Sequence, residues 1–66
     1  MNSKDQNKLL KAGYTILRRD DHPTVRIKEK SQETQEWRTL EKDFKSKASR
    51  DRRMDELLEY DTILED

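Results

Sequence analysis

The sequence YTILRRDDHPTVRIKEK, residues 14–30, decides the fold of this chain. Residues 14–19 are rich in β-forming side chains. Residues 24–30 show the alternation of polar and apolar side chains that is typical of a strand. The DDHP sequence between them is typical of a turn, and Pro23 stands just before the second strand, where its missing N–H does least harm. This segment therefore predicts an antiparallel β-hairpin.

A short helix is predicted ahead of the hairpin. Ser3 and Gln6 have the spacing of a capping box, in which each side chain bonds to the backbone amide of the other residue. Gly13, the only glycine, stands where a left-handed residue ends a helix. We therefore expect the helix to run from Ser3 to Ala12.

A third strand and a second helix are predicted after the hairpin. Residues 31–35 are polar and suit a loop, and residues 36–41 are expected to form the third strand. Ser46 is a good N-cap for a helix over residues 47–60, which contain no Gly, Pro or β-branched residue. Residues 61–66 are expected either to dock weakly or to fray.

These elements predict an α+β fold, with a short N-terminal helix, a small three-stranded antiparallel sheet and the C-terminal helix packed on one sheet face. One core is expected to hold Tyr14, Ile16 or Leu17, Val25, Ile27, Trp37, Leu40, Phe44, Ala48, Met54 and Leu58. Trp37 is the expected anchor of this core.

The composition indicates one small domain over residues 1–66, with its core over about residues 9–60. The chain has 66 residues, 29% hydrophobic and 45% charged, and no cysteine that could form a disulfide or a zinc site. No apolar run resembles a signal peptide or a membrane span, so we expect a cytoplasmic protein with no membrane association.

The charges are divided unevenly along the chain. Residues 1–54 hold all 15 Lys and Arg and nine acids, which gives them a net charge of +6. Residues 55–66 hold six acids and no base. The body is therefore basic and the C-terminal tail acidic, although the net charge is zero.

The sequence argues against an enzyme. There is no Cys nucleophile, and a single glycine cannot form a Gly-rich phosphate loop. Asp20, Asp21 and His22 are conceivable as a metal or acid–base cluster, but an exposed turn explains them better. We expect no catalytic residue, no metal and no cofactor.

Basic residues form two candidate binding surfaces. Because Val25 and Ile27 are expected to face the core, Arg26 and Lys28 should lie on the opposite face of the sheet. Arg18 or Arg19, and Arg38, are expected beside them, where they could contact phosphates or enter a major groove. A second cluster precedes and opens the C-terminal helix, with Lys45, Lys47 and Arg50 as its candidates. Solvated strand and helix faces explain both clusters somewhat better than a binding role does.

The segment from residue 14 to residue 58 resembles the arm-type DNA-binding domains of tyrosine recombinases, which combine a three-stranded sheet with a C-terminal helix. The resemblance is carried by the basic hairpin, by the third strand with Trp37, and by the FKSKA sequence at residues 44–48. In that family the exposed sheet face enters the major groove. The resemblance implies a DNA-binding role for Arg26 and Lys28, with Arg18 or Arg19 and Arg38 beside them.

Two functions follow as hypotheses. The first is a small non-enzymatic nucleic-acid-binding protein, accessory or regulatory, whose acidic tail competes with phosphate for the basic sheet face. The second is a protein-interaction module, or a homodimer, in which the basic body of one chain meets the acidic tail of another or of a partner protein.

Overall fold

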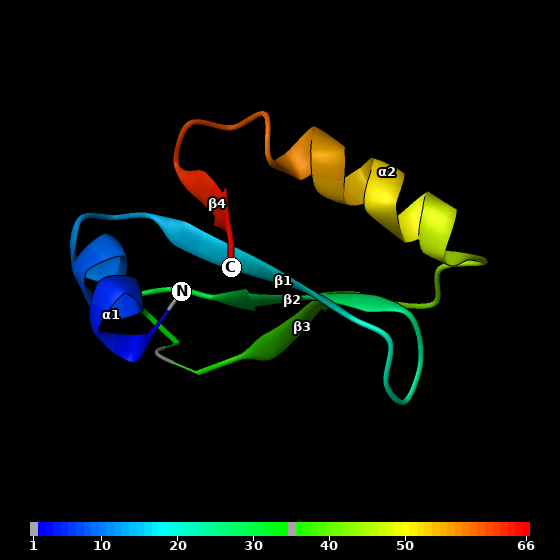
Figure 1. Ribbon diagram of the computed structural model, residues 1–66, viewed down its shortest axis with the longest axis horizontal. Helices are drawn as coiled ribbons and strands as arrows, with labels where there is room; N and C mark the ends of the chain where they lie inside the picture. The colour runs from blue at the N-terminus through cyan, green and yellow to red at the C-terminus, as the bar shows by residue number, and fades with distance from the viewer. Residues whose placement is uncertain (1, 35) are drawn as a thin grey trace.

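The computed structural model describes residues 2–34 and 36–66, so Met1 and the Gln35 position of the expected 31–35 loop lie outside the described residues. The order of elements is α1 (Ser3–Lys11), β1 (Thr15–Asp20), β2 (Arg26–Lys30), β3 (Arg38–Glu41), α2 (Lys47–Leu57) and β4 (Ile63–Glu65). Figure 1 shows the two helices on opposite sides of the sheet. The expected α+β class is confirmed.

The sheet has four strands in the order β3-β2-β1-β4. The β1–β2 and β2–β3 pairs are antiparallel, as the hairpin and the third strand predicted. β4 adds to the other edge of β1 and runs parallel to it. The prediction of a three-stranded, wholly antiparallel sheet was therefore wrong, and the sheet is mixed.

The acidic tail forms β4 because its two apolar residues find partners on both sides of the sheet. Ile63 lies opposite Thr15 and packs against the cluster under α2, whereas Leu64 lies opposite Ile16 on the other face. The amide of Asp66 donates to the carbonyl of Leu17 at 2.8 Å, which extends the pairing by one residue. Of the two expectations for the tail, docking is what the structure shows.

The main core lies between the sheet and α2. Leu17 and Ile27 point from β1 and β2 towards Met54 and Leu57 on the helix, and all four side chains are buried. The N-cap of α2 is Ser46, as predicted, and its hydroxyl accepts from the amide of Ser49 at 3.1 Å. The helix ends at Leu57, three residues before the predicted end.

α1 covers one end of the opposite sheet face. Leu10 and Ile16 are both buried, although Leu17, the neighbour of Ile16, is buried under α2. Both Ile16 and Leu17 therefore belong to the core, because the two sheet faces are each covered at that end. The N-cap is Asn2, whose side chain accepts from the amide of Asp5 at 2.9 Å, rather than the predicted Ser3.

The helix C-terminus follows the prediction more closely. Ala12 is the C-cap, one residue after the end of α1, and Gly13 has a positive φ of 95°. The chain can reverse direction there because glycine adopts this conformation without a steric penalty.

Several residues predicted for the core lie outside it. Leu40 is 38% exposed and Ala48 is exposed, while Tyr14, Val25 and Trp37 are half-buried. Phe44 and Leu58 pack against the core from its margin, and Leu10 and Leu57 are core residues that the prediction omitted. For Leu40 and Trp37 the physical cause is that β3 is an edge strand of the sheet, so apolar side chains on and beside it stay near solvent.

Within residues 2–34 and 36–66, no helix is long and apolar enough to cross a bilayer.

Candidate functional site

Four basic side chains lie on the sheet face opposite α2. In the β1–β2 register Arg18 lies opposite Lys28, Asp20 opposite Arg26, and Ile16 opposite Lys30. Partners in a ladder share a face, and residues two apart on one strand do so too. We call the group of Arg18, Arg26, Lys28 and Lys30, together with the adjacent Trp37, the basic sheet face.

Trp37 joins this face through contacts with two of its cations. The Arg18 guanidinium carbon lies 4.1 Å from the centroid of the Trp37 ring, and the Lys30 ammonium lies 5.9 Å from it. Such cation–π contacts hold long side chains in place over an aromatic surface. Trp37 therefore fixes the positions of two cations instead of anchoring the core.

The carboxylate of Asp66 occupies one end of the basic sheet face. Its Oδ2 accepts from Nε of Arg18 at 2.9 Å and from Nη2 at 2.7 Å, and its Oδ1 accepts from the Gln6 amide at 3.0 Å. These bonds, with the one from Arg18 first, hold the pKa of Asp66 below its ordinary value of 3.8. A carboxylate thus sits where a guanidinium and an amide donate together, an arrangement that also suits a phosphate oxygen.

A second carboxylate, Asp20, belongs to the same face. It accepts from the amide of His22 at 3.1 Å and pairs with the Lys28 ammonium at 3.3 Å. The His22 amide and then Lys28 lower the pKa of Asp20 below its ordinary value. Two of the four cations on the face are thereby neutralised.

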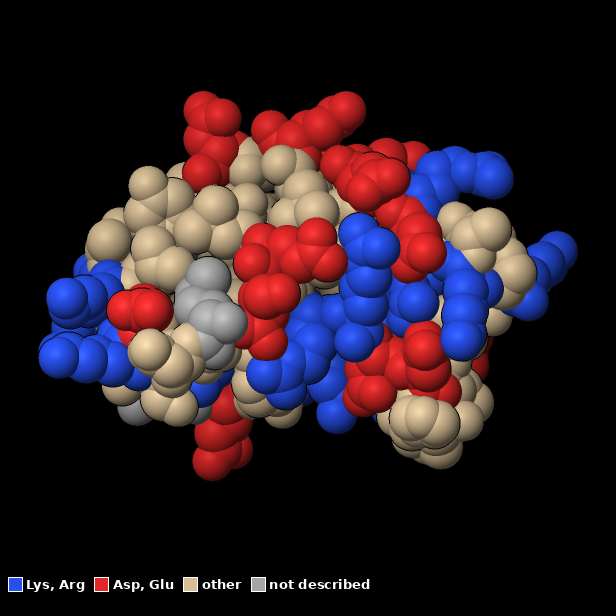
Figure 2. All heavy atoms as spheres, in the orientation of Figure 1, with Lys and Arg blue, Asp and Glu red and all other residues tan. Residues whose placement is uncertain are grey.

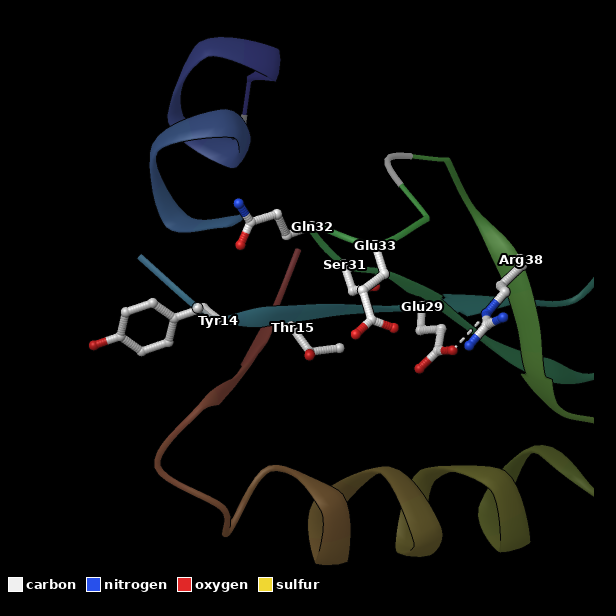
Figure 3. A pocket seen from close by; sticks show the side chains of 8 residues that line it. Tyr14, Thr15, Glu29, Ser31, Gln32, Glu33 and Arg38 are labelled. Atoms are coloured by element: carbon white, nitrogen blue, oxygen red, sulfur yellow. Dashed lines mark hydrogen bonds and ion pairs between the residues drawn. The ribbon is translucent and has the colours of Figure 1, made fainter. Parts of the chain in front are cut away.

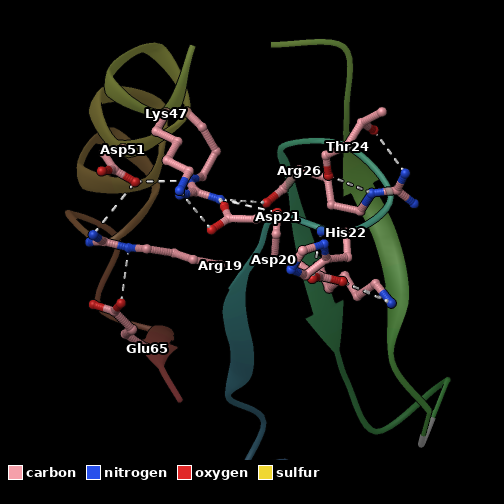
Figure 4. Close-up of polar contacts among 11 residues, drawn as sticks. Arg19, Asp20, Asp21, His22, Thr24, Arg26, Lys47, Asp51 and Glu65 are labelled. Carbon is pink, nitrogen blue, oxygen red and sulfur yellow. Dashed lines mark hydrogen bonds and ion pairs between the residues drawn. The ribbon is translucent and has the colours of Figure 1, made fainter.

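The other two cations bond only to neutral groups in the described part of the chain. Arg26 donates to the carbonyl and the hydroxyl of Thr24, at 3.1 and 2.8 Å, and points away from α2 (Figure 4). Lys30 donates to the side-chain oxygen of Gln6 at 3.1 Å. Their charges remain uncompensated at short range, so the face has a positive balance.

Two predicted members of the site lie on the other side of the sheet. Arg19 faces α2 and β4, where it pairs with Asp51, Asp55 and Glu65 at 3.6, 3.8 and 3.0 Å. Arg38 lies opposite Glu29 in the β2–β3 register and bonds to its carboxylate at 2.7 Å. The structure therefore selects Arg18 over Arg19 and separates Arg38 from the basic sheet face.

The second predicted cluster does not form a common surface. Lys45 is exposed ahead of α2, and Lys47, also exposed, pairs with Asp21 at 3.3 Å. Arg50 points inward and is only 4% exposed. We therefore separate these three residues from the candidate site on the sheet.

Arg50 joins α2 to the β1–β2 turn. Its Nη1 donates to Asp21 at 2.8 Å and to the carbonyls of Asp20 and Arg26 at 3.1 and 3.4 Å, while its Nε donates to Asp51 at 2.7 Å. Burial opposes the charge of this guanidinium, but the bonds to Asp51 and Asp21 outweigh it and raise the pKa of Arg50. Arg50 is a structural cation.

The two acidic turn residues considered for metal binding, Asp20 and Asp21, have other partners. The hydrogen bond from Arg50, followed by that from Lys47, lowers the pKa of Asp21. Asp20 points to Lys28 on the opposite side of the sheet. Over the residues that the structure describes, no group of three or more His, Cys, Asp or Glu side chains is placed to hold a metal ion.

A polar hollow of about 360 Å³ lies near the start of β1, on the α2 side of the sheet (Figure 3). Its lining residues are Gly13, Tyr14, Thr15, Glu29, Ser31, Gln32, Glu33 and Arg38. The cation in this hollow, Arg38, is already bound to Glu29, so the hollow offers mainly hydroxyls and carboxylates. It lacks the uncompensated positive charge of the basic sheet face.

Acidic and basic groups alternate over much of the surface. Figure 2 shows acidic side chains along the top of this view and in its middle, and basic side chains at both ends and across the middle, so the two signs are interspersed on this face. The opposite charges of the body and the tail are thus largely paired within one chain, through Arg18 with Asp66 and Arg19 with Glu65.

Lys30, Gln6 and Asp66 are residues of the site that the sequence did not predict, and Trp37 was predicted to lie in the core. Lys30 continues the alternation of Arg26 and Lys28, so the same period of two would have included it. Gln6 and Asp66 give no comparable signal, because their meeting depends on α1 and β4 docking beside each other.

Comparisons with known proteins add no evidence about the site. No family model, no curated protein and no solved structure matches this chain. The geometry defines a class, a small α+β domain with a basic sheet face, and that face is the feature of this domain that bears on function.

Proposed function

We propose that this protein is a non-enzymatic nucleic-acid-binding module that contacts phosphates through the basic sheet face. The single observation that carries the proposal is the alignment of Arg18, Arg26, Lys28 and Lys30 on one side of two paired strands. Phosphate contacts of this kind supply most of the sequence-independent affinity of proteins for nucleic acids. Residues 14–58 resemble the arm-type domains of tyrosine recombinases, in which an exposed sheet face contacts DNA.

Arg26 and Lys30 are the residues that should contribute most. Within residues 2–34 and 36–66 neither forms an ion pair with a carboxylate, so neither must break an ion pair before it binds a phosphate. Arg18 and Lys28 must first exchange Asp66 and Asp20 for the ligand. Trp37 lies among these cations and offers an aromatic surface beside the side chains that are proposed to contact phosphates.

The test is fluorescence anisotropy of labelled single-stranded and duplex oligonucleotides at about 50 and 200 mM salt, where counterion release makes affinity fall with salt. We expect the combined substitution Arg26→Ala and Lys30→Ala to weaken binding by about tenfold at the lower salt, since two phosphate contacts are lost. The slope of log affinity against log salt should become shallower by roughly 0.9 for each contact.

The matched control removes the same charge away from the basic sheet face. Lys45→Ala with Arg52→Ala alters two exposed residues, one just before α2 and one within it. We expect this variant to bind within about twofold of the wild type, because long-range attraction between exposed charges is screened. Equal losses in the two double variants would contradict a site on the sheet, and no binding of either oligonucleotide at low salt would refute the proposed function.

Asp66→Asn provides an independent prediction. The substitution keeps the shape of the side chain but removes the charge that competes with phosphate for Arg18. We expect affinity for the same oligonucleotide to rise by about three- to tenfold. Anisotropy at low salt measures this change.

Asp61→Asn is the control for the Asp66 variant. Asp61 is exposed in the same acidic segment, so its substitution changes the net charge by the same amount away from Arg18. A similar gain in both variants would mean that general repulsion, rather than occupation of the site, limits binding.

The alternative function is a protein-interaction module or a homodimer, in which the basic body of one chain meets the acidic tail of another chain or of a partner protein. It has a specific obstacle. Glu65 and Asp66 already bind Arg19 and Arg18 of their own body, at 3.0 and 2.7 Å. A tail from another chain would have to displace these contacts and the β1–β4 pairing. We therefore do not propose body-to-tail association.

A further inference from the structure

β3 is an exposed edge strand whose outer side lacks a partner. It is the terminal strand of the sheet, so in the described part of the chain no further strand pairs with it. Three of its four residues are exposed, including Leu40 at 38%. Unpaired N–H and C=O groups on such an edge form a template for another strand.

A β-bulge places the two charged side chains of β3, Arg38 and Glu41, on the same face of the sheet. Glu29 lies opposite Arg38 and Ile27 opposite Glu41, with one extra residue on β3 between them. Ile27 and Glu29 are two apart on β2, so Arg38 and Glu41 share a face although they are three apart. The strand thus carries a cation at one end and an anion at the other, both on the α2 side.

This arrangement is complementary to itself. If two copies of β3 pair antiparallel about an axis between Thr39 and Leu40, each Arg38 lies opposite the Glu41 of the other copy. Arg38 already bonds to Glu29 at 2.7 Å, and Glu41 to Arg53 at 2.9 Å. The pairing therefore joins these two ion pairs into a row of alternating charges that crosses the interface.

The other free edge lacks this property. An antiparallel pair of β4 strands centred on Leu64 would place Ile63 opposite Glu65, an apolar group against a charge. We propose that the β3 edge binds a second copy of this chain, giving an antiparallel, twofold-symmetric dimer with a continuous sheet. This inference is independent of nucleic-acid binding by the basic sheet face.

Sedimentation velocity from about 10 µM to 1 mM tests the dimer by mass action. We expect the wild-type mass to rise with concentration from 8.0 kDa towards twice that value. Arg38→Glu makes both ends of β3 acidic, and Glu41→Arg makes both basic. Each variant alone should self-associate at least about tenfold more weakly, because like charges then lie opposite each other.

An equimolar mixture of the Arg38→Glu and Glu41→Arg variants tests the proposed contact between chains most directly. Opposite charges face each other again in the mixed dimer, so association should return to about the wild-type strength. The mixture does not repair the bonds to Glu29 and Arg53 inside each chain, so recovery reports the contact between chains. Circular dichroism checks folding, and Arg38→Gln with Glu41→Gln replaces any variant that does not fold, with weakened association expected.

Three results would overturn the inference. They are a wild-type protein that stays monomeric at about 1 mM, charge variants that associate as strongly as the wild type, and a mixture that associates no better than its components.

Discussion

Replacement of Arg50 with Ala is expected to destabilise the fold by about 3 kcal/mol, since removal of one partner from a buried ion pair costs about 3–5 kcal/mol and both carboxylates here keep some access to water. Arg50 is 4% exposed and bonds to Asp21, Asp51 and two backbone carbonyls. The substitution removes the Arg50 donor from all of these acceptors, and only the weaker contacts of Lys47 with Asp21 and of Arg19 with Asp51 remain to the two carboxylates. A domain of this size has a total stability of only about 3–5 kcal/mol, so much of the variant should be unfolded at 25 °C.

Urea unfolding followed by circular dichroism measures this effect. Arg52→Ala is the matched control, because Arg52 lies on the same helix but is exposed. We expect the control to change the free energy of unfolding by less than about 0.5 kcal/mol. Similar midpoints for the two variants would show that Arg50 does not tie α2 to the β1–β2 turn.

The second large effect is expected at Met54. This side chain is fully buried between α2 and the sheet, against Leu17 and Ile27. Met54→Ala removes three heavy atoms from the middle of the core and leaves a cavity, which should cost about 3 kcal/mol. The same unfolding experiment gives the value.

Met54→Leu separates the cavity from the loss of methionine itself. It keeps the volume and is expected to cost less than about 1.5 kcal/mol. If both Met54 variants were equally destabilised, the core would depend on the particular shape of Met54 rather than on the space it fills. If neither were destabilised, α2 would not be packed on the sheet through this residue.

The local parts of the fold could be predicted from the sequence. The alternation of residues 24–30 and the DDHP turn specify the hairpin, and Ser46 followed by a run without Gly or Pro specifies the start of α2. These signals act between neighbours in the chain, so they do not depend on the rest of the molecule.

β4 could not be predicted in the same way. Two apolar residues among acids are a weak strand signal, and the tail is positioned by a strand far away in the chain: Arg18 and Asp66 are separated by 48 positions. The burial of both Ile16 and Leu17 was left open for the same reason, because the alternation of β1 does not show that helices lie on both of its sides.

The candidate site was predicted in part. The period of two placed Arg26 and Lys28 together, and it left Arg18 and Arg19 as alternatives. Arg38 was misplaced because Trp37 was expected in the core. Trp37 instead contacts Arg18 and Lys30, which turns its neighbour Arg38 to the α2 side. Arg50 looked like a ligand-binding cation because nothing local shows that a charged helix residue is buried.

The most direct test of the central claim, that nucleic acid binds the basic sheet face, is a chemical-shift map of the ¹⁵N-labelled protein titrated with the oligonucleotide that binds most tightly in the anisotropy experiment. We predict that the largest changes fall on the amides of Arg18, Arg26, Lys28 and Lys30 and on the indole N–H of Trp37. Changes centred on α2, or on the hollow beside Glu29 and Arg38, would contradict the account.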